Sequence, residues 1–183
     1  QAKEYAKSLS LLFTYATNGH VIEEFSFLTN KQVTIKEFPS PAELKRRYIS
    51  AILQNAVDKS KGEKILNEPY YYAPSFNLRH YQEGAVHNAV AAITGGDKRL
   101  LLTLATGTGK TVIAFNLTWK LLKSGYFRRV LFIADRNFLR NQAYNTFAPF
   151  GDARTIIEEG KTPKQHNVYF SIYQALYSLS PSG

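Results

Sequence analysis

Apolar positions in the second half of the chain follow two different spacings, and together they predict an α/β domain. Residues 100–104, 130–134 and 168–173 are almost continuously apolar, as in strands buried on both faces of a sheet. Around them, apolar residues recur at helical spacing over residues 80–93, 111–123 and 137–147. Because strands that alternate with helices form parallel sheets, the pattern predicts a parallel sheet covered by helices on both faces.

The first 75 residues predict smaller elements. Residues 1–9 have helical spacing, and the β-prone runs 11–15 and 21–27 flank an Asn18-Gly19 turn, which predicts a hairpin. Ser40 and Pro41 are typical of a helix start, and the predicted helix continues to Leu53. The charged residues 58–64 and the tyrosine-rich residues 69–74 are predicted to be loops, with the main domain boundary between residues 69 and 76.

The strongest chemical signal is Leu-Ala-Thr-Gly-Thr-Gly-Lys-Thr at residues 104–111, between a predicted strand and a predicted helix. That is the context of a phosphate-binding loop, in which glycines let the backbone N–H groups turn toward a polyphosphate. The loop residues predicted to bind ATP are Thr106, Gly107, Thr108, Gly109, Lys110 and Thr111. Lys110 would reach the β- and γ-phosphates, and the Thr111 hydroxyl would hold Mg²⁺. With the alternating strands, this loop predicts a RecA-like nucleotide-binding domain.

The amino-acid composition indicates which kinds of partner the chain could bind. The formal net charge is +9, which suits a polyanion such as nucleic acid, although lysines on a solvated face are the alternative. The chain has no cysteine, which excludes disulfides and thiolate metal sites and is expected of a cytoplasmic protein. Its four histidines lack the spacing of zinc ligands. The longest apolar run is too short to cross a bilayer, so no membrane partner is expected.

A short motif upstream of the loop, Leu-Arg-His-Tyr-Gln at residues 78–82, predicts an adenine site. The Gln82 amide offers a donor and an acceptor, the pair needed for the Hoogsteen edge of adenine. Arg79 would lie beside the base or the phosphates, and Phe76 could stack on the ring. The alternative is an ordinary helix start.

Polar residues that follow the two later predicted strands are candidates for DNA contacts. Arg136, Asn137 and Gln142 come after the strand at 130–134, and Ser171 and Gln174 lie at the end of the strand at 168–173. The carboxyl edge of an open α/β sheet is where ligands bind, and backbone phosphates need donors without base readout. The alternative is that Asp135 and Arg136 merely cap the helix that follows.

Four segments in this order resemble the restriction (motor) subunit of type I restriction–modification enzymes, whose motor is superfamily 2 helicase-like: residues 79–82, 105–111, 131–137 and 168–174. Leu104 stands where a strict phosphate loop has glycine, a position that superfamily 2 helicases often relax. Residues 13–19 and 38–44 resemble the stretch that joins this family's nuclease to its motor. Gln1 and Tyr5 match the Gln-x-x-x-Tyr motif that closes its PD-(D/E)xK nuclease, and are carried over as catalytic residues with Lys110 and Thr111.

The resemblance implies three parts: the end of the nuclease domain (1–38), a helical linker (39–75) and an incomplete first RecA-like motor domain (76–183). It implies a type I site-specific deoxyribonuclease that uses ATP and Mg²⁺ to translocate double-stranded DNA and cleaves unmodified foreign DNA. Modification (methyltransferase) and specificity subunits are the implied partners. Since the chain has no Asp-Glu pair, the acidic Walker B motif is expected beyond it, and the 183 residues alone are expected to be inactive.

Two other functions remain open at this point. One is another superfamily 2 DNA helicase or translocase, such as a repair helicase or a type III restriction subunit, which shares the motor motifs. The other is a nucleotide-binding or assembly module without catalysis of its own.

Overall fold

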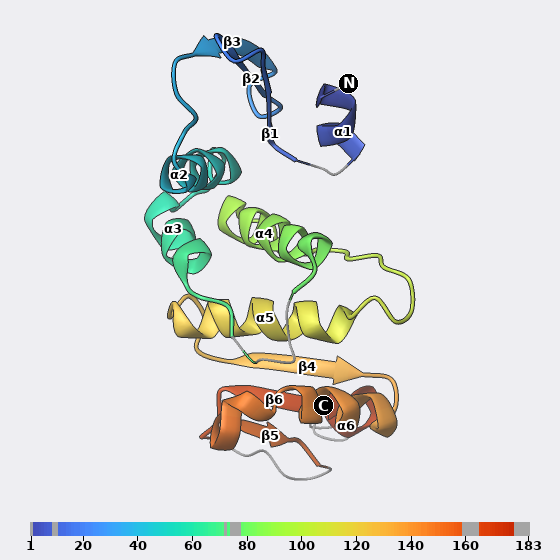
Figure 1. Ribbon diagram of the computed structural model, residues 1–183. Helices are drawn as coiled ribbons and strands as arrows, with labels where there is room; N and C mark the ends of the chain where they lie inside the picture. The colour runs from blue at the N-terminus through green and yellow to red at the C-terminus, as the bar shows by residue number, and fades with distance from the viewer. Residues whose placement is uncertain (1, 9–10, 72, 74–77, 159–164, 178–183) are drawn as a thin grey trace. The chain divides into compact units, whose positions relative to one another are not determined.

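The computed structural model describes residues 2–8, 11–71, 73, 78–158 and 165–177. The chain divides into two compact units, residues 1–54 and 55–183 (Figure 1). The division falls inside the segment that the sequence assigns to a linker.

The first unit is a three-stranded antiparallel sheet with a helix on either side of it in the chain. Its elements are α1 (Ala2–Ser8), β1 (Phe13–Thr17), β2 (Ile22–Ser26), β3 (Lys31–Ile35) and α2 (Pro41–Ile52). The strands pair in the order β1-β2-β3. The predicted hairpin is confirmed, and the Asn18 carboxamide oxygen accepts from the N–H groups of His20 and Val21 to close its turn. Strand β3 was not predicted, because its half-polar sequence gives no strong signal until it pairs with β2.

A buried carboxylate organises this unit. Glu24 is buried in β2, where Tyr15 donates to it at 3.0 Å and Arg47 of α2 forms an ion pair with it at 3.0 Å. The α2 start is as predicted: the Ser40 hydroxyl accepts from the Glu43 N–H, and Pro41 opens the helix. A single acidic residue thus ties the hairpin to the following helix.

In the second unit, helices α3 (Lys59–Asn67), α4 (His80–Gly95) and α5 (Lys110–Lys123) pack against one another. Helix α3 corrects the prediction of a loop at residues 58–64. The Asp58 carboxylate caps it by accepting from the Lys61 N–H, and Ile65 and Leu66 are buried on one side. The charged residues of this segment therefore gave a wrong prediction, because a helix that buries one apolar stripe can carry many lysines on its other faces.

A three-stranded parallel sheet in the order β4-β6-β5 follows the helices. Its elements are β4 (Val130–Ala134), α6 (Asn137–Thr146), the 3₁₀ helix η1 (Ala148–Ala153), β5 (Arg154–Ile156), β6 (Val168–Ile172) and α7 (Tyr173–Tyr177). Phe147 is central to the core, with its ring centroid 5.3 Å from that of Phe115 on α5 and 5.2 Å from that of Phe170 on β6. The predicted mixed α/β architecture with a parallel sheet is confirmed at this level.

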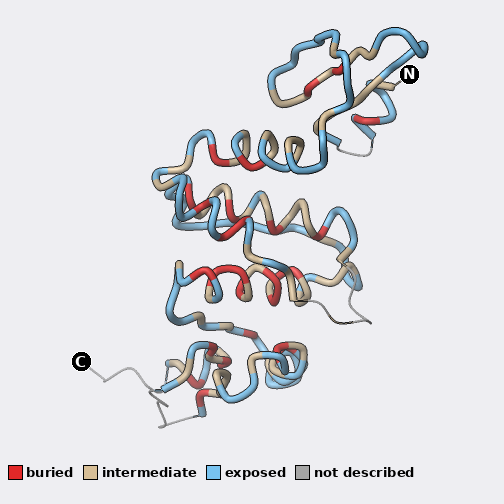
Figure 2. Tube along the Cα trace, turned by 60° about the vertical axis from the view of Figure 1, so that its left-hand side comes forward, coloured by how far each residue is buried: buried red, intermediate tan, exposed pale blue. Residues whose placement is uncertain are grey.

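The predicted strand at residues 100–104 is wrong in this structure. Buried residues lie mostly in helices and strands (Figure 2). Leu100, Leu101 and Leu102, by contrast, form no ladder and are 47, 92 and 45% exposed. Leu131 and Ile133 of β4 are exposed as well, so this strand is not covered on both faces. An apolar run becomes a strand only when a neighbour satisfies its backbone, and no described strand pairs with residues 100–104.

Candidate nucleotide site and carboxyl edge of the sheet

The phosphate loop turns through two glycines in the left-handed region. Gly107 has φ of 77° and Gly109 has φ of 83°, and Gly109 is the N-cap of α5. A Cβ on Gly109 would lie 2.5 Å from Nε2 of Gln82, whereas a Cβ on Gly107 would meet nothing within 4 Å. Glycine is therefore required at 109 for both conformation and space, and at 107 for conformation alone.

The loop leaves its donors available. Within the part of the chain that the structure describes, the backbone N–H groups of residues 107–111 donate to no protein group. The Gly109 carbonyl instead accepts from Val112 and Ile113, which begins the helix. Unpaired N–H groups at the amino end of a 14-residue helix fit a polyphosphate, because the helix dipole favours anions there.

Lys110 lies over this loop. Its Nζ donates to the carbonyl oxygens of Leu104 at 3.0 Å and Ala105 at 2.8 Å, so the ammonium is held at the point where the loop begins. A phosphate oxygen is a charged acceptor and bonds an ammonium more strongly than these carbonyls do. Thr111 is half-buried in the first turn of α5, and Thr106 is exposed.

The loop is fastened to the start of α4. Thr108 is the anchor: its carbonyl oxygen accepts from the Tyr81 hydroxyl at 2.9 Å and from Nε2 of Gln82 at 3.0 Å. Gln82 is only 6% exposed, and its Oε1 accepts from the Arg79 N–H at 2.9 Å. Among the described residues, one N–H and one lone pair of the Gln82 amide have no partner. Sequence reasoning missed Tyr81, for which the only signal was its place beside Gln82.

Three of the polar residues proposed for DNA, Arg136, Asn137 and Gln174, closely follow the carboxyl ends of two adjacent strands. Ala134 of β4 is opposite Ile172 of β6, so Arg136 and Gln174, which follow these strands, share one edge of the sheet. The amino end of α5, which carries the phosphate loop, lies at the same end of the unit (Figure 1). Arg136 is exposed and forms an ion pair of 3.6 Å with Asp135.

Asn137 and Gln142 are exposed on α6, whereas Ser171 is not available. Ser171 is 0% exposed in β6 and its hydroxyl donates to the Ile172 carbonyl at 3.2 Å. Its predicted DNA contact is therefore corrected: β6 is buried on both faces at this point, since the neighbouring Phe170 is also 0% exposed, and neither face leaves the Ser171 hydroxyl accessible.

The remaining predicted residues lie elsewhere. Tyr5 is 68% exposed on α1, in the first unit, and Gln1 and Phe76 lie outside the described residues. Among described residues, no group of three or more His, Asp or Glu side chains could hold a metal ion. No helix in the described ranges is long and apolar enough to span a bilayer.

Comparison with known proteins places these features in a family. The profile of the family described as "Type III restriction enzyme, res subunit" matches residues 75–181, which include the phosphate loop and the sheet. The chain belongs to this family of helicase-like restriction-enzyme subunits.

Individual relatives extend the similarity to the first unit. The chain is 36% identical, over 96% of its length, to the endonuclease subunit of the type I restriction enzyme EcoAI of Escherichia coli, of which it covers 22%. It is 46% identical over 38% of its length to the EcoKI endonuclease subunit of Escherichia coli, of which it covers 6%.

A solved structure agrees in fold over nearly the whole chain. A fragment assigned to the HsdR subunit of a type I restriction enzyme from Vibrio vulnificus matches with a TM-score of 0.77 and 40% identity, over 98% of this chain and 32% of that one. The predicted resemblance to type I restriction subunits is confirmed. The chain spans about a fifth of the EcoAI subunit.

Proposed function

We propose that the chain is part of the restriction subunit of a type I restriction–modification enzyme, which translocates double-stranded DNA with ATP and cleaves DNA that lacks the modification. The observation that carries the nucleotide site is the set of N–H groups at residues 107–111 that have no partner among the described residues. Beside them, Lys110 bonds to carbonyls of the same loop. The type I assignment rests on relatives that match both units.

In this proposal the loop N–H groups bind the ATP phosphates and Lys110 exchanges its carbonyl partners for phosphate oxygens. The Thr111 hydroxyl is the described group suited to Mg²⁺, and a bound Mg²⁺ would neutralise the charge that develops in phosphoryl transfer. Gln82 reads adenine with its remaining N–H and lone pair, with Arg79 and Phe76 beside it. Holding Thr108 fixed through Tyr81 and Gln82 preorganises the loop before the nucleotide arrives.

DNA contacts are proposed for Arg136, Asn137 and Gln174 at the carboxyl edge and for Gln142, which is exposed on α6. Gln1 and Tyr5 are proposed to close the nuclease domain, with residues 1–38 as its end, 39–75 as the linker and 76–183 as the motor. Modification and specificity subunits are the proposed partners, and the cytoplasm is the proposed location.

The test is ATP hydrolysis by the parent polypeptide with duplex DNA, with and without the partner subunits. Turnover that requires the partners and an unmodified recognition site supports the type I assignment, whereas turnover on any DNA without partners favours a free-standing translocase. Lys110→Ala should reduce turnover at least a hundredfold, because it removes the cation next to the transferred phosphoryl group. Lys59→Ala, which removes an exposed ammonium on α3 of the same unit, is the matched control and should leave turnover unchanged.

A further inference from the structure

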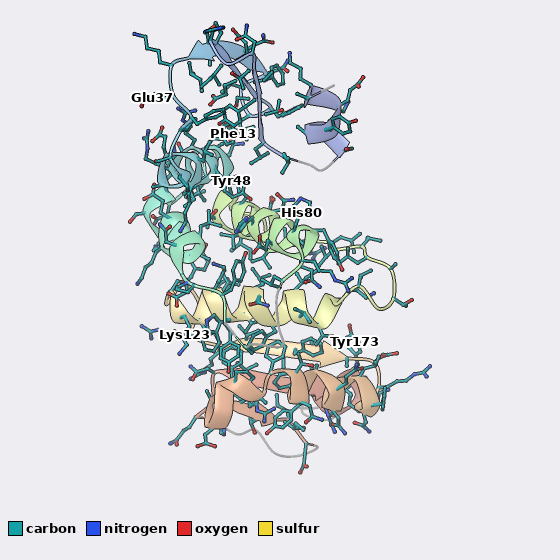
Figure 3. All side chains as sticks on the ribbon, in the orientation of Figure 1. Phe13, Glu37, Tyr48, His80, Lys123 and Tyr173 are labelled. Atoms are coloured by element: carbon teal, nitrogen blue, oxygen red, sulfur yellow. The ribbon has the colours of Figure 1, made fainter. Side chains whose placement is uncertain are left out.

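A cavity of about 880 Å³ lies at the end of the second unit away from the phosphate loop. It is formed by the carboxyl end of α5, the turn that leads into β4, η1 and the residues just before β6. Lys123, at this end of α5, and Tyr173, at the carboxyl edge of the sheet, lie at opposite ends of the unit in Figure 3. The cavity is therefore separate from the nucleotide site and from the proposed DNA contacts.

The floor of the cavity is apolar and firmly supported. Trp119 and Phe150 contribute rings whose centroids are 5.3 Å apart, with Leu122 beside them. Both rings pack on Phe115 of the core, with centroids at 6.1 and 5.5 Å. Because these rings are held from behind by core contacts, the floor is preformed, and a bound side chain need not order it.

The rim is cationic. Lys123, Arg128 and Arg129 are exposed and line the cavity, together with the half-buried His166, and none of the lining residues in the described chain is acidic. The Lys123 Nζ lies 4.7 Å from the centroid of the Trp119 ring, which keeps the ammonium at the edge of the floor. Three permanent positive charges thus surround an apolar depression.

We propose that this cavity binds an acidic peptide segment of a partner protein, with an apolar side chain on the floor and carboxylates on Lys123, Arg128 and Arg129. An arginine fork pairs two N–H groups with one carboxylate, and an apolar anchor in a preformed pocket is the usual centre of such an interface. The phosphates of duplex DNA could pair with the cationic rim. Duplex DNA would nevertheless leave the apolar floor exposed to water, because its bases are stacked and paired and cannot reach it. The charge and the floor together favour the peptide.

The test uses peptide selection and the single tryptophan of the chain, Trp119, as the reporter. A random twelve-residue peptide library is selected on the chain, and the enriched peptides are titrated while Trp119 emission is followed. We expect enriched peptides with net negative charge and at least one aromatic or large aliphatic residue, which change Trp119 emission. Arg128→Glu/Arg129→Glu should weaken their binding at least tenfold, and Lys123→Glu should weaken it by a smaller factor.

The matched control is Lys98→Glu/Arg99→Glu, which reverses the same two charges at exposed positions that do not line the cavity. It should leave peptide binding unchanged, and circular dichroism confirms that each variant is folded. The proposal is overturned if no acidic peptide is enriched, or if Arg128→Glu/Arg129→Glu binds enriched peptides as tightly as the original chain. It is also overturned if a twenty-residue oligothymidine, and not the peptides, changes Trp119 emission through Arg128 and Arg129.

Discussion

Gly109→Ala should destabilise the second unit through a contact that can be traced atom by atom. A left-handed φ costs a non-glycine residue about 1 kcal/mol. The new Cβ would lie 2.5 Å from Nε2 of Gln82, so this side chain must move. It then loses its bonds to the Thr108 carbonyl and the Arg79 N–H, each worth about 1 kcal/mol. We expect the free energy of unfolding to fall by about 3 kcal/mol in total.

Gly107→Ala provides the control, since it carries the same strain at φ of 77° but meets no atom within 4 Å. It should cost only about 1 kcal/mol. Urea unfolding followed by Trp119 emission reports on the second unit. In a Gln82→Ala background the cost of Gly109→Ala should fall to that of Gly107→Ala, a coupling of about 2 kcal/mol. Equal costs for the two glycines, or an unchanged cost in the Gln82→Ala background, would refute the reasoning.

Three further outcomes can be measured. Tyr81→Phe removes one of two donors to the Thr108 carbonyl oxygen. The affinity for ATP, measured by calorimetric titration, should therefore fall about three- to tenfold. An unchanged affinity would show that the Gln82 bond alone is enough to hold the loop in place. Lys120 is 2% exposed, and its Nζ donates to carbonyl oxygens at the end of α3. Because Lys120→Met leaves these carbonyls unpaired, it should lower the free energy of unfolding by about 2–3 kcal/mol, measured by urea unfolding. A change below about 0.5 kcal/mol would contradict this expectation. Burial, and then the hydrogen bond and charge of Glu24, raise the pKa of Tyr15 to about 12 from 10.0, with Arg47 opposing them. Because the unfolded chain ionises first, stability should be full below pH 10 and fall between pH 10 and 12, and Tyr15→Phe should flatten that fall in thermal unfolding followed at several pH values.

Elements with a local cause could be predicted from the sequence. The Asn18-Gly19 turn and the Ser40 cap each act within four residues, and the hairpin and α2 form where these signals stand. Strands β3 and β5 were missed because their pairing partners, not their own residues, make them strands. The leucines at 100–102 show the converse, since a strongly apolar run stays irregular without a neighbouring strand.

In the candidate site, too, the features with a local cause could be predicted from the sequence and the long-range contacts could not. The glycines and Lys110 could be found from spacing alone, because a phosphate loop is one continuous segment. The attachment of Thr108 to Tyr81 spans 27 residues, and no local pattern encodes it. The burial of Ser171 was also beyond the sequence, since an all-apolar strand gives no alternation from which to read which side chains face the core.

The exposed leucines beside the phosphate loop also determine how the chain behaves in concentrated solution. Leu101 is 92% exposed, and Leu131 and Ile133 add further uncovered apolar surface on β4. Exposed apolar surface promotes self-association, and a net charge of +9 opposes it by mutual repulsion. Added salt screens that repulsion. The 183-residue chain should therefore stay monomeric at low ionic strength and self-associate and precipitate as the salt concentration rises.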